Sequence, residues 1–167
     1  MQAYKFLAAG SRGPFSGHAW TPGGWTEAEG ALEPCRNGVH ALPVDALAPW
    51  LDEELWEIEL DGEVAKEAGL LVGRRGRLVR RVEEWDGQAA GRFARACARH
   101  AQEIAEGTDA AQGFADKAAS LAETTADARM AAVVTFMAVR AAEETDADGW
   151  TTERSWQSHR LAADLGL

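Results

Sequence analysis

The segment Leu-Trp-Glu-Ile-Glu-Leu at residues 55–60 gives the clearest indication of the fold. Trp56, Ile58 and Leu60 alternate with two glutamates, and this period of two predicts a β-strand with one buried face and one solvent face. The following Asp61-Gly62 is typical of a hairpin turn, so we expect the strand to end there. Further strands are expected at residues 3–9, 39–42 and 77–85.

Residues 10–31 combine turn chemistry with large aromatic side chains. Glycine and proline predict tight turns, whereas Trp20 and Trp25 indicate that the loop is packed. Short strands are expected around residues 17–20 and 25–28. A short helical segment is expected at residues 44–51, with three apolar side chains on one side: Val44, Leu47 and Leu51.

After Asp86-Gly87 the hydrophobic period changes from two to 3.6, which predicts helices. Gly107 ends the first helix, Thr108 caps the second, and the fourth is expected at residues 151–165. The third is expected to bury Met130, Val133, Val134, Met137 and Ala141. The sequence thus predicts an α+β protein with a strand-rich, Trp-rich domain at residues 1–86 and an antiparallel array of about four helices at residues 87–167.

The formal net charge of −10 opposes binding to nucleic acid and to anionic membranes, because phosphates would repel the chain. No stretch approaches the roughly 18 apolar residues of a transmembrane helix, and residues 1–10 do not resemble a signal peptide. We therefore expect a cytoplasmic protein in which Cys35 and Cys97 are free thiols.

The loop at residues 11–25 is the preferred candidate for a ligand pocket. Gly-rich turns bring backbone amides close to a ligand, and tryptophan rings stack on planar groups or cations. The same aromatic residues would also serve to fill the core of a small sheet, so packing remains the alternative. The predicted ligand-binding residues are Arg12, His18, Trp20, Trp25 and Cys35, and His40 is the predicted general acid or base.

Cys35 and His40, joined by Cys97 and His100, have the ligand types of a tetrahedral zinc site. Their spacings match no established zinc signature, so no metal is predicted and core packing is favoured for Cys97 and His100. Cys35 is also a candidate nucleophile beside Arg36, although nothing in the sequence places a base next to it.

Five arginines fall within eight residues of this acidic chain: Arg74, Arg75, Arg77, Arg80 and Arg81. Guanidinium groups suit bidentate contacts with phosphate or carboxylate ligands. The favoured alternative is that they neutralise acidic residues such as Glu57 and Glu59 on a neighbouring strand, because alternation would divide the cluster between two faces.

A series of landmarks in the N-terminal half resembles a family of uncharacterised bacterial, largely actinobacterial, proteins over roughly residues 3–85. The landmarks are Tyr4-Lys5-Phe6, Gly23-Gly24-Trp25, Pro34-Cys35, Gly38-Val39-His40-Ala41, residues 54–60 and Gly62-Glu63. The family has no settled activity, so the resemblance implies a shared fold and no particular chemistry.

The order of residues 38–42, a short helix and residues 56–60 is also similar to the middle of ADP-ribosyltransferase folds. This second resemblance implies a pocket for NAD, with Lys5 where the family presents His or Arg and His40 at a tyrosine position. The late catalytic glutamate of that family has no clear counterpart in this chain.

Two hypotheses follow. The first is a small-molecule or nucleotide-binding protein with an ADP-ribosyltransferase-like N-terminal half, whose helices support the pocket and which acts as an enzyme if His40 is catalytic. The second is a non-catalytic interaction or homo-oligomerising protein that uses its Ala-rich helices. The sequence contains no dinucleotide-binding, P-loop, zinc-protease or nucleophile-elbow motif, so the cofactor is unknown.

Overall fold

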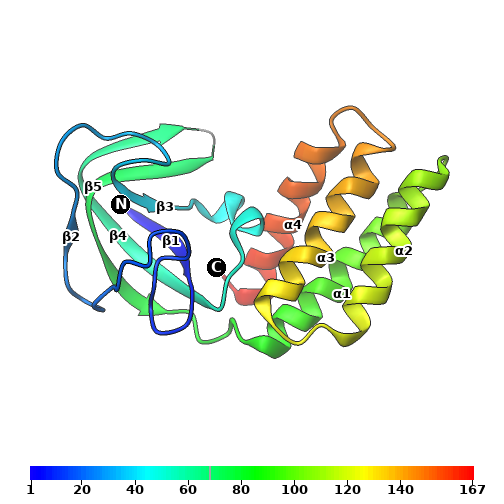
Figure 1. Cartoon of the computed structure of the whole chain (residues 1–167), viewed down its shortest axis with the longest axis horizontal. Helices are drawn as coiled ribbons and strands as arrows, with labels where there is room; N and C mark the ends of the chain where they lie inside the picture. Colours follow the sequence, from blue (N-terminus) through cyan, green and yellow to red (C-terminus); the bar gives the residue numbers. More distant parts are fainter. Residues whose placement is uncertain (68) are drawn as a thin grey trace. The chain divides into compact units, whose positions relative to one another are not determined.

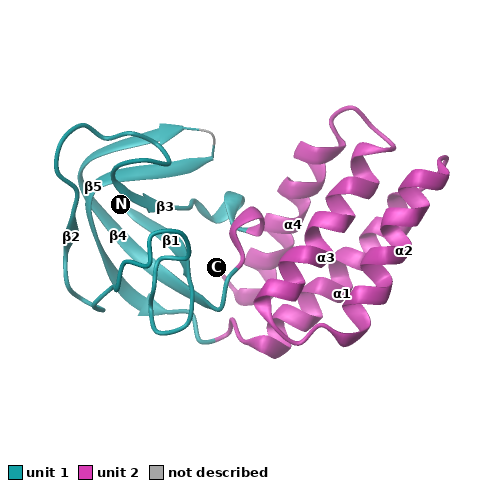
Figure 2. Ribbon diagram, viewed as in Figure 1, with its two compact units in different colours: residues 1–47, 52–83 teal, residues 48–51, 84–167 magenta. Residues whose placement is uncertain are grey.

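The computed structural model describes residues 1–67 and 69–167. It confirms an α+β protein, with an antiparallel sheet in the N-terminal half and four helices in the C-terminal half. The chain divides into two compact units (Figure 2). The first, which we call the sheet unit, contains Met1–Leu47 and Asp52–Glu83; the second, the helical unit, contains Ala48–Leu51 and Glu84–Leu167.

The sheet unit contains five strands joined by antiparallel pairing. They are β1 (Gln2–Leu7), β2 (Thr26–Glu27), β3 (Val39–Ala41), β4 (Glu54–Glu67) and β5 (Leu70–Arg81). Along the sheet the order is β1-β4-β5-β2, and β3 pairs with β5 beside β2. Figure 1 shows β4 and β5 as a long, strongly curved hairpin around β1.

The sheet closes on itself at β1 and β3. The Tyr4 amide donates to the Leu42 carbonyl at 2.8 Å, and the Leu42 amide donates to the Tyr4 carbonyl at 2.7 Å. The pairings β1-β4, β4-β5 and β5-β3 therefore end in a bridge back to β1, which makes a small barrel-like ring. Its core contains buried side chains from all four strands and from the loop: Ala3, Leu7, Trp20, Val39, Ala41, Ile58, Leu60, Leu71 and Leu78.

The expected end of the central strand at Asp61-Gly62 is wrong. Strand β4 continues to Glu67, and its register with β5 shifts between Asp61 and Val64. Gly62 has a φ of 78°, which glycine adopts without steric cost in a β-bulge as well as in a hairpin turn. The Asp-Gly pair thus indicates a residue with a positive φ, and the sequence alone does not distinguish a bulge from the end of a strand.

Other expectations for the sheet unit need smaller corrections. Strand β5 begins at Leu70 and ends at Arg81, earlier at both ends than the expected 77–85. Ala19 forms only an isolated bridge with Arg12 where a short strand was expected. The short helical segment consists of two 3₁₀ turns, because Pro49 cannot donate an intrahelical hydrogen bond. Val44, expected on the same side as Leu47 and Leu51, is exposed, whereas those two residues are buried.

The helical unit contains α1 (Gly87–Ile104), α2 (Asp109–Thr124), α3 (Ala128–Glu143) and α4 (Gly149–Leu165). Helices α1, α2 and α3 pack on one another, and α4 packs mainly on α3. Three helices begin at a side chain that accepts a backbone N–H of the first turn, which satisfies a donor otherwise left unpaired. These N-caps are Asp86, Thr108 and Asp127.

The predicted buried face of α3 is only partly correct. Val134 and Ala141 are buried, whereas Met130 is 37% and Val133 is 43% exposed. The helix packs instead through a face rich in small residues, which lets the helix backbones approach closely. Its buried residues are Ala128, Ala131, Val134, Thr135, Ala138, Val139, Ala141 and Ala142. Across the described part of the chain, no helix has both the length and the apolar character required to cross a lipid bilayer.

Candidate functional site

Lys5 lies on the core face of strand β1. Alternate residues of a strand point to the same side, and the neighbours of Lys5 on that side are Ala3 and Leu7, both buried in the core. The Lys5 side chain therefore extends from the inner face of the sheet, where a lysine is rare.

The Lys5 amine is held between a carbonyl group and an aromatic ring. Its Nζ donates to the backbone oxygen of His40 at 2.6 Å and lies 5.2 Å from the centroid of the Trp20 ring. Trp20 itself is only 8% exposed. A cation over a tryptophan face is attracted by the ring quadrupole, so these two contacts fix the position of the amine.

Burial lowers the pKa of Lys5 from its ordinary value of 10.5 to about 8. Burial is the only cause of this shift, so no carboxylate among the described residues compensates the charge. A lysine in such surroundings exists partly as a neutral amine near pH 7, which is the form that acts as a nucleophile or base.

The ring of His40 is engaged by its own loop. Its Nε2 lies 2.9 Å from the Cys35 amide and accepts that hydrogen bond, so Nε2 is unprotonated. Burial and the Lys5 charge lower the pKa of His40, while a hydrogen bond with the Gly38 backbone opposes them. His40 is thus neutral at pH 7. Acid–base use of Nε2 would require a substrate to replace the Cys35 amide, and the catalytic role stays a prediction.

Two of the predicted ligand-binding residues, His18 and Trp20, contact each other next to the Lys5 side chain that Trp20 faces. The two rings meet edge to face, with centroids 5.3 Å apart and an interplanar angle of 88°. The His18 Nε2 also lies 3.4 Å from the Thr26 hydroxyl on β2. We call Lys5, His18, Trp20 and His40 the Lys5 cluster; Lys5 of β1 and two residues of the loop between β1 and β2 contribute side chains, and His40 of β3 contributes its backbone carbonyl.

The other predicted ligand-binding residues have different surroundings. The ring of Trp25 is covered by Arg75 and Arg77, whose guanidinium carbons lie 4.7 and 4.8 Å from its centroid. Arg12 is exposed, and its backbone pairs with Ala8 and Ala19. Cys35 is exposed and meets the cluster only through its amide, which donates to His40.

The arginines of strand β5 neutralise the acidic face of strand β4, as favoured from the sequence. Arg77 lies 2.7 Å from Glu59, and Arg75 pairs with Asp61. The remaining pairs are Arg74 with Glu63, Arg80 with Glu57, and Arg81 with both Glu54 and Glu83. The register of the β4-β5 hairpin places the two sets of charges opposite each other.

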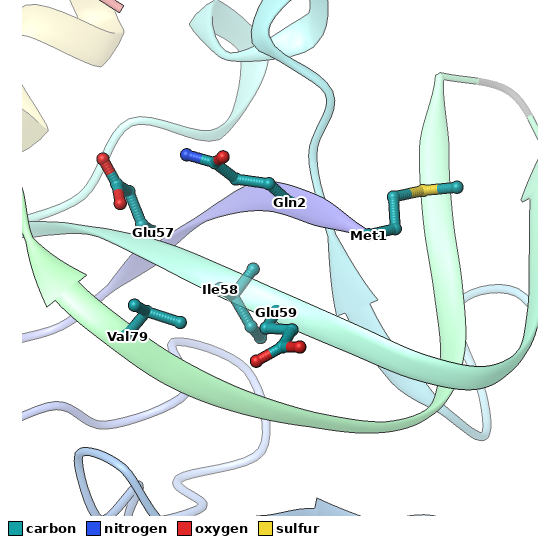
Figure 3. Close-up of a pocket in the computed structure, with 6 residues that line it drawn as sticks. All are labelled: Met1, Gln2, Glu57, Ile58, Glu59 and Val79. Atoms are coloured by element: carbon teal, nitrogen blue, oxygen red, sulfur yellow. The ribbon is translucent and has the colours of Figure 1, made fainter.

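A pocket of about 280 Å³ lies on β1, β4 and β5 (Figure 3). It is open to solvent, and none of the predicted site residues lines it. Its lining consists of Met1, Gln2, Glu57, Ile58, Glu59 and Val79. Both of its carboxylates already pair with arginines of β5, so the pocket offers no unsatisfied charge to a ligand.

The two cysteines are free thiols, as expected. Cys97 is buried in the helical unit, where burial raises the pKa of its thiol well above the ordinary value and leaves it unreactive. Within residues 1–67 and 69–167, no group of three or more His, Cys, Asp and Glu side chains is arranged to hold a metal ion.

The helical unit contains a buried polar network that sequence reasoning missed. Glu153 of α4 is 1% exposed; its carboxylate lies 2.8 Å from Nδ1 of His100 and accepts from Gln157 at 2.9 Å. Gln157 also donates to the Thr135 carbonyl of α3. The His100 ring stacks on Trp156, with centroids 3.8 Å apart. This network ties α1, α3 and α4 together.

Sequence reasoning gave Lys5 a role only through the ADP-ribosyltransferase resemblance and missed its burial. The available signal was the alternation Ala3-Lys5-Leu7, which places a lysine among the inward positions of a strand. Comparison with protein-family models, with curated proteins and with solved structures gives no match, so both resemblances stay predictions.

Proposed function

We propose that the sheet unit binds a small molecule at the Lys5 cluster. The observation that carries this proposal is an amine fixed on the inner face of the sheet between the Trp20 ring and the His40 carbonyl, with no carboxylate of residues 1–67 and 69–167 to balance it. An unpaired charge in such a place reduces stability, and a ligand that interacts with the amine would offset that cost.

The neighbouring rings support a planar ligand. The amine lies over the buried Trp20 ring, and the exposed His18 ring meets Trp20 at nearly a right angle. Aromatic walls with a small number of fixed polar groups are typical of small-molecule sites. A nucleotide or a small carbonyl or carboxyl compound has both the planar part and the polar part that this arrangement suits.

A thermal-shift measurement on the full chain tests the proposal. The probes are ATP, NAD, pyruvate, benzaldehyde and inorganic phosphate, each with the wild type and with Lys5→Met. A probe at 100 times its dissociation constant adds about 2.7 kcal/mol to the free energy of unfolding, which is readily detected. We expect at least one probe to stabilise the wild type and to lose that effect in Lys5→Met.

Lys66→Met is the matched control, because Lys66 is an exposed lysine of strand β4 in the same unit. It removes one positive charge without touching the cluster, and the stabilisation should persist. A shift of equal size in the wild type and in Lys5→Met would contradict the assignment of the site. The absence of a shift with all five probes would contradict binding of these ligand classes.

A second candidate function, self-association, is favoured by the apolar face that α3 leaves exposed. Phe136 and Trp150 are each 41% exposed and contact each other edge to face, with centroids 6.1 Å apart. Met130 and Val133 continue the same apolar surface. Such a surface suits a second copy of this chain, because a two-fold axis lets one patch bury its own equivalent.

Phe136→Glu tests self-association. If the wild type sediments as a dimer, this variant should sediment as a monomer, because a charge would have to be buried in the interface. Phe15→Glu, at a residue 87% exposed in the sheet unit, is the matched control and should stay dimeric. A wild type that remains monomeric at all protein concentrations would contradict this candidate.

A further inference from the structure

We propose that helix α1 docks a short acidic segment of a partner protein through the exposed guanidinium groups of Arg92, Arg95 and Arg99. We call these three residues the α1 arginine stripe. The stripe lies in the helical unit, so this docking goes beyond both proposed functions, which use the Lys5 cluster and the apolar surface of α3.

The three arginines share one face of the helix. Their spacing of three and four residues places successive side chains one above the other, and all three are exposed. They cover about 10 Å along the axis, since each helical residue adds about 1.5 Å. Phe93 and Cys97, on the opposite side of the helix, are almost completely buried. The stripe thus presents three guanidinium groups to solvent while the rest of α1 packs into the helical unit.

The stripe has no counter-charge of its own. None of its three side chains forms an ion pair with a carboxylate of residues 1–67 and 69–167. The five arginines of strand β5, by contrast, each pair with a glutamate or an aspartate. Like charges three or four residues apart on a helix repel each other, so the stripe reduces the stability of α1. An anionic partner would offset that cost.

The position of Arg95 is defined by the glycine one turn before it. A Cβ atom at Gly91 would lie 3.3 Å from Nη1 of Arg95 and 2.6 Å from the Thr125 carbonyl oxygen. Glycine therefore lets both groups lie close to the helix backbone. Because the guanidinium group of Arg95 packs along its own helix, a partner has less side-chain freedom to remove when it binds.

Carboxylates fit the chemistry and the spacing of the stripe. A planar guanidinium group forms two parallel hydrogen bonds with a carboxylate, which gives this pair both strength and a defined geometry. An extended peptide advances about 3.4 Å per residue, so about four residues span the stripe. A segment with several consecutive Asp or Glu residues can therefore place a carboxylate near each arginine.

Acidic residues at both ends of the stripe limit the length of the partner. Glu84 and Asp86 precede the stripe, Glu103 and Glu106 follow it, and all four residues are exposed. Charges interact over roughly 8 Å at physiological ionic strength, so these carboxylates act locally. A nucleic acid has phosphates that continue beyond the stripe, and the flanking carboxylates would repel them. A short acidic segment avoids this repulsion and is the favoured partner.

Fluorescence anisotropy with the full chain tests the proposal. The probe is a pentaglutamate peptide with a neutral fluorophore, titrated with protein at about 0.1 M and about 1 M salt, where the Debye length is about 10 Å and about 3 Å. The test variant replaces all three arginines of the stripe with Gln, which retains a high helix propensity. We expect the wild type to bind, and its affinity to fall by about tenfold in this variant and at the higher salt concentration.

The matched control replaces Arg36, Lys66 and Lys117 with Gln. These three residues are exposed and lie far apart in the sequence, so this variant has the net charge of the test variant and an intact stripe. Binding should be unchanged in the control. The absence of saturable binding to the wild type, or an equal loss in both variants, would overturn the proposal. Tighter binding of an oligothymidylate of the same length would also overturn it, because the stripe would then be a nucleic-acid surface.

Discussion

Lys5→Met is expected to raise the free energy of unfolding at pH 7 by up to about 3 kcal/mol. Folding lowers the pKa of Lys5 from 10.5 to about 8. Below pH 8 the residue is charged in both states, and the folded state has to bury that charge. Methionine has a similar length and no charge, so it removes this cost.

The pH dependence gives this prediction its sign. Between pH 8 and 10.5 the unfolded chain binds more protons at Lys5 than the folded chain, so the contribution of Lys5 to wild-type stability rises with pH across this window. Lys5→Met should lack this rise, and the difference between the variants should shrink from pH 7 to pH 10. Urea denaturation at pH 7 and at pH 10 measures the free energy of unfolding of the wild type and of Lys5→Met, with Lys66→Met as the control. A Lys5→Met variant less stable than the wild type at pH 7 would contradict the account.

Glu153→Ala is expected to cost about 3–5 kcal/mol of stability, because it breaks a buried polar network by removing one partner. The carboxylate is almost fully buried and contacts both His100 and Gln157. Without it, His100 Nδ1 loses this partner, and the Gln157 amide nitrogen keeps its bond to the Thr135 carbonyl. Burial is the main cause that raises the pKa of Glu153, and the nearby His100 opposes that rise.

Two further variants distinguish the stability contributed by the polar network from the effect of replacing any glutamate on a helix. Glu153→Gln keeps the shape and an acceptor oxygen, so it should lose less stability than Glu153→Ala. Glu103→Ala changes an exposed glutamate of α1 and should stay within about 0.5 kcal/mol of the wild type. The denaturant midpoint of each of the three variants, compared at an unchanged slope of unfolding free energy against denaturant concentration, measures the loss of stability. Equal losses in Glu103→Ala and Glu153→Ala would show that the network is not stabilising.

The fold class was predictable because it depends on hydrophobic period. The alternation at residues 56–60 and the 3.6-residue period after residue 87 identify the strands and helices directly. The end of β4 was not predictable, because Asp61-Gly62 fits a bulge as well as a hairpin turn. The buried face of α3 was not predictable either. Close helix packing favours alanine on the buried face, and the larger Met130 and Val133 lie on the exposed face.

The candidate site was predictable in part. Loop composition singled out His18 and Trp20, and both lie in the Lys5 cluster. Trp25 was placed with them on the same grounds, yet it contacts the β5 arginines, because β2 pairs with β5 immediately after it. The alternation Ala3-Lys5-Leu7 indicates that Lys5 points inward, but lysine is ordinarily a surface residue, and its burial also depends on the closure of the sheet, which is not local in sequence.

An NMR titration of the lysine amines tests the central claim most directly. With only three lysines in the chain, protein labelled at lysine should give three resolved side-chain signals, and the one missing from Lys5→Met identifies Lys5. We expect this signal to titrate with a pKa of about 8, below the ordinary lysine value of 10.5. A Lys5 signal that titrates at the ordinary value of 10.5 would contradict the presence of an uncompensated amine on the inner face of the sheet.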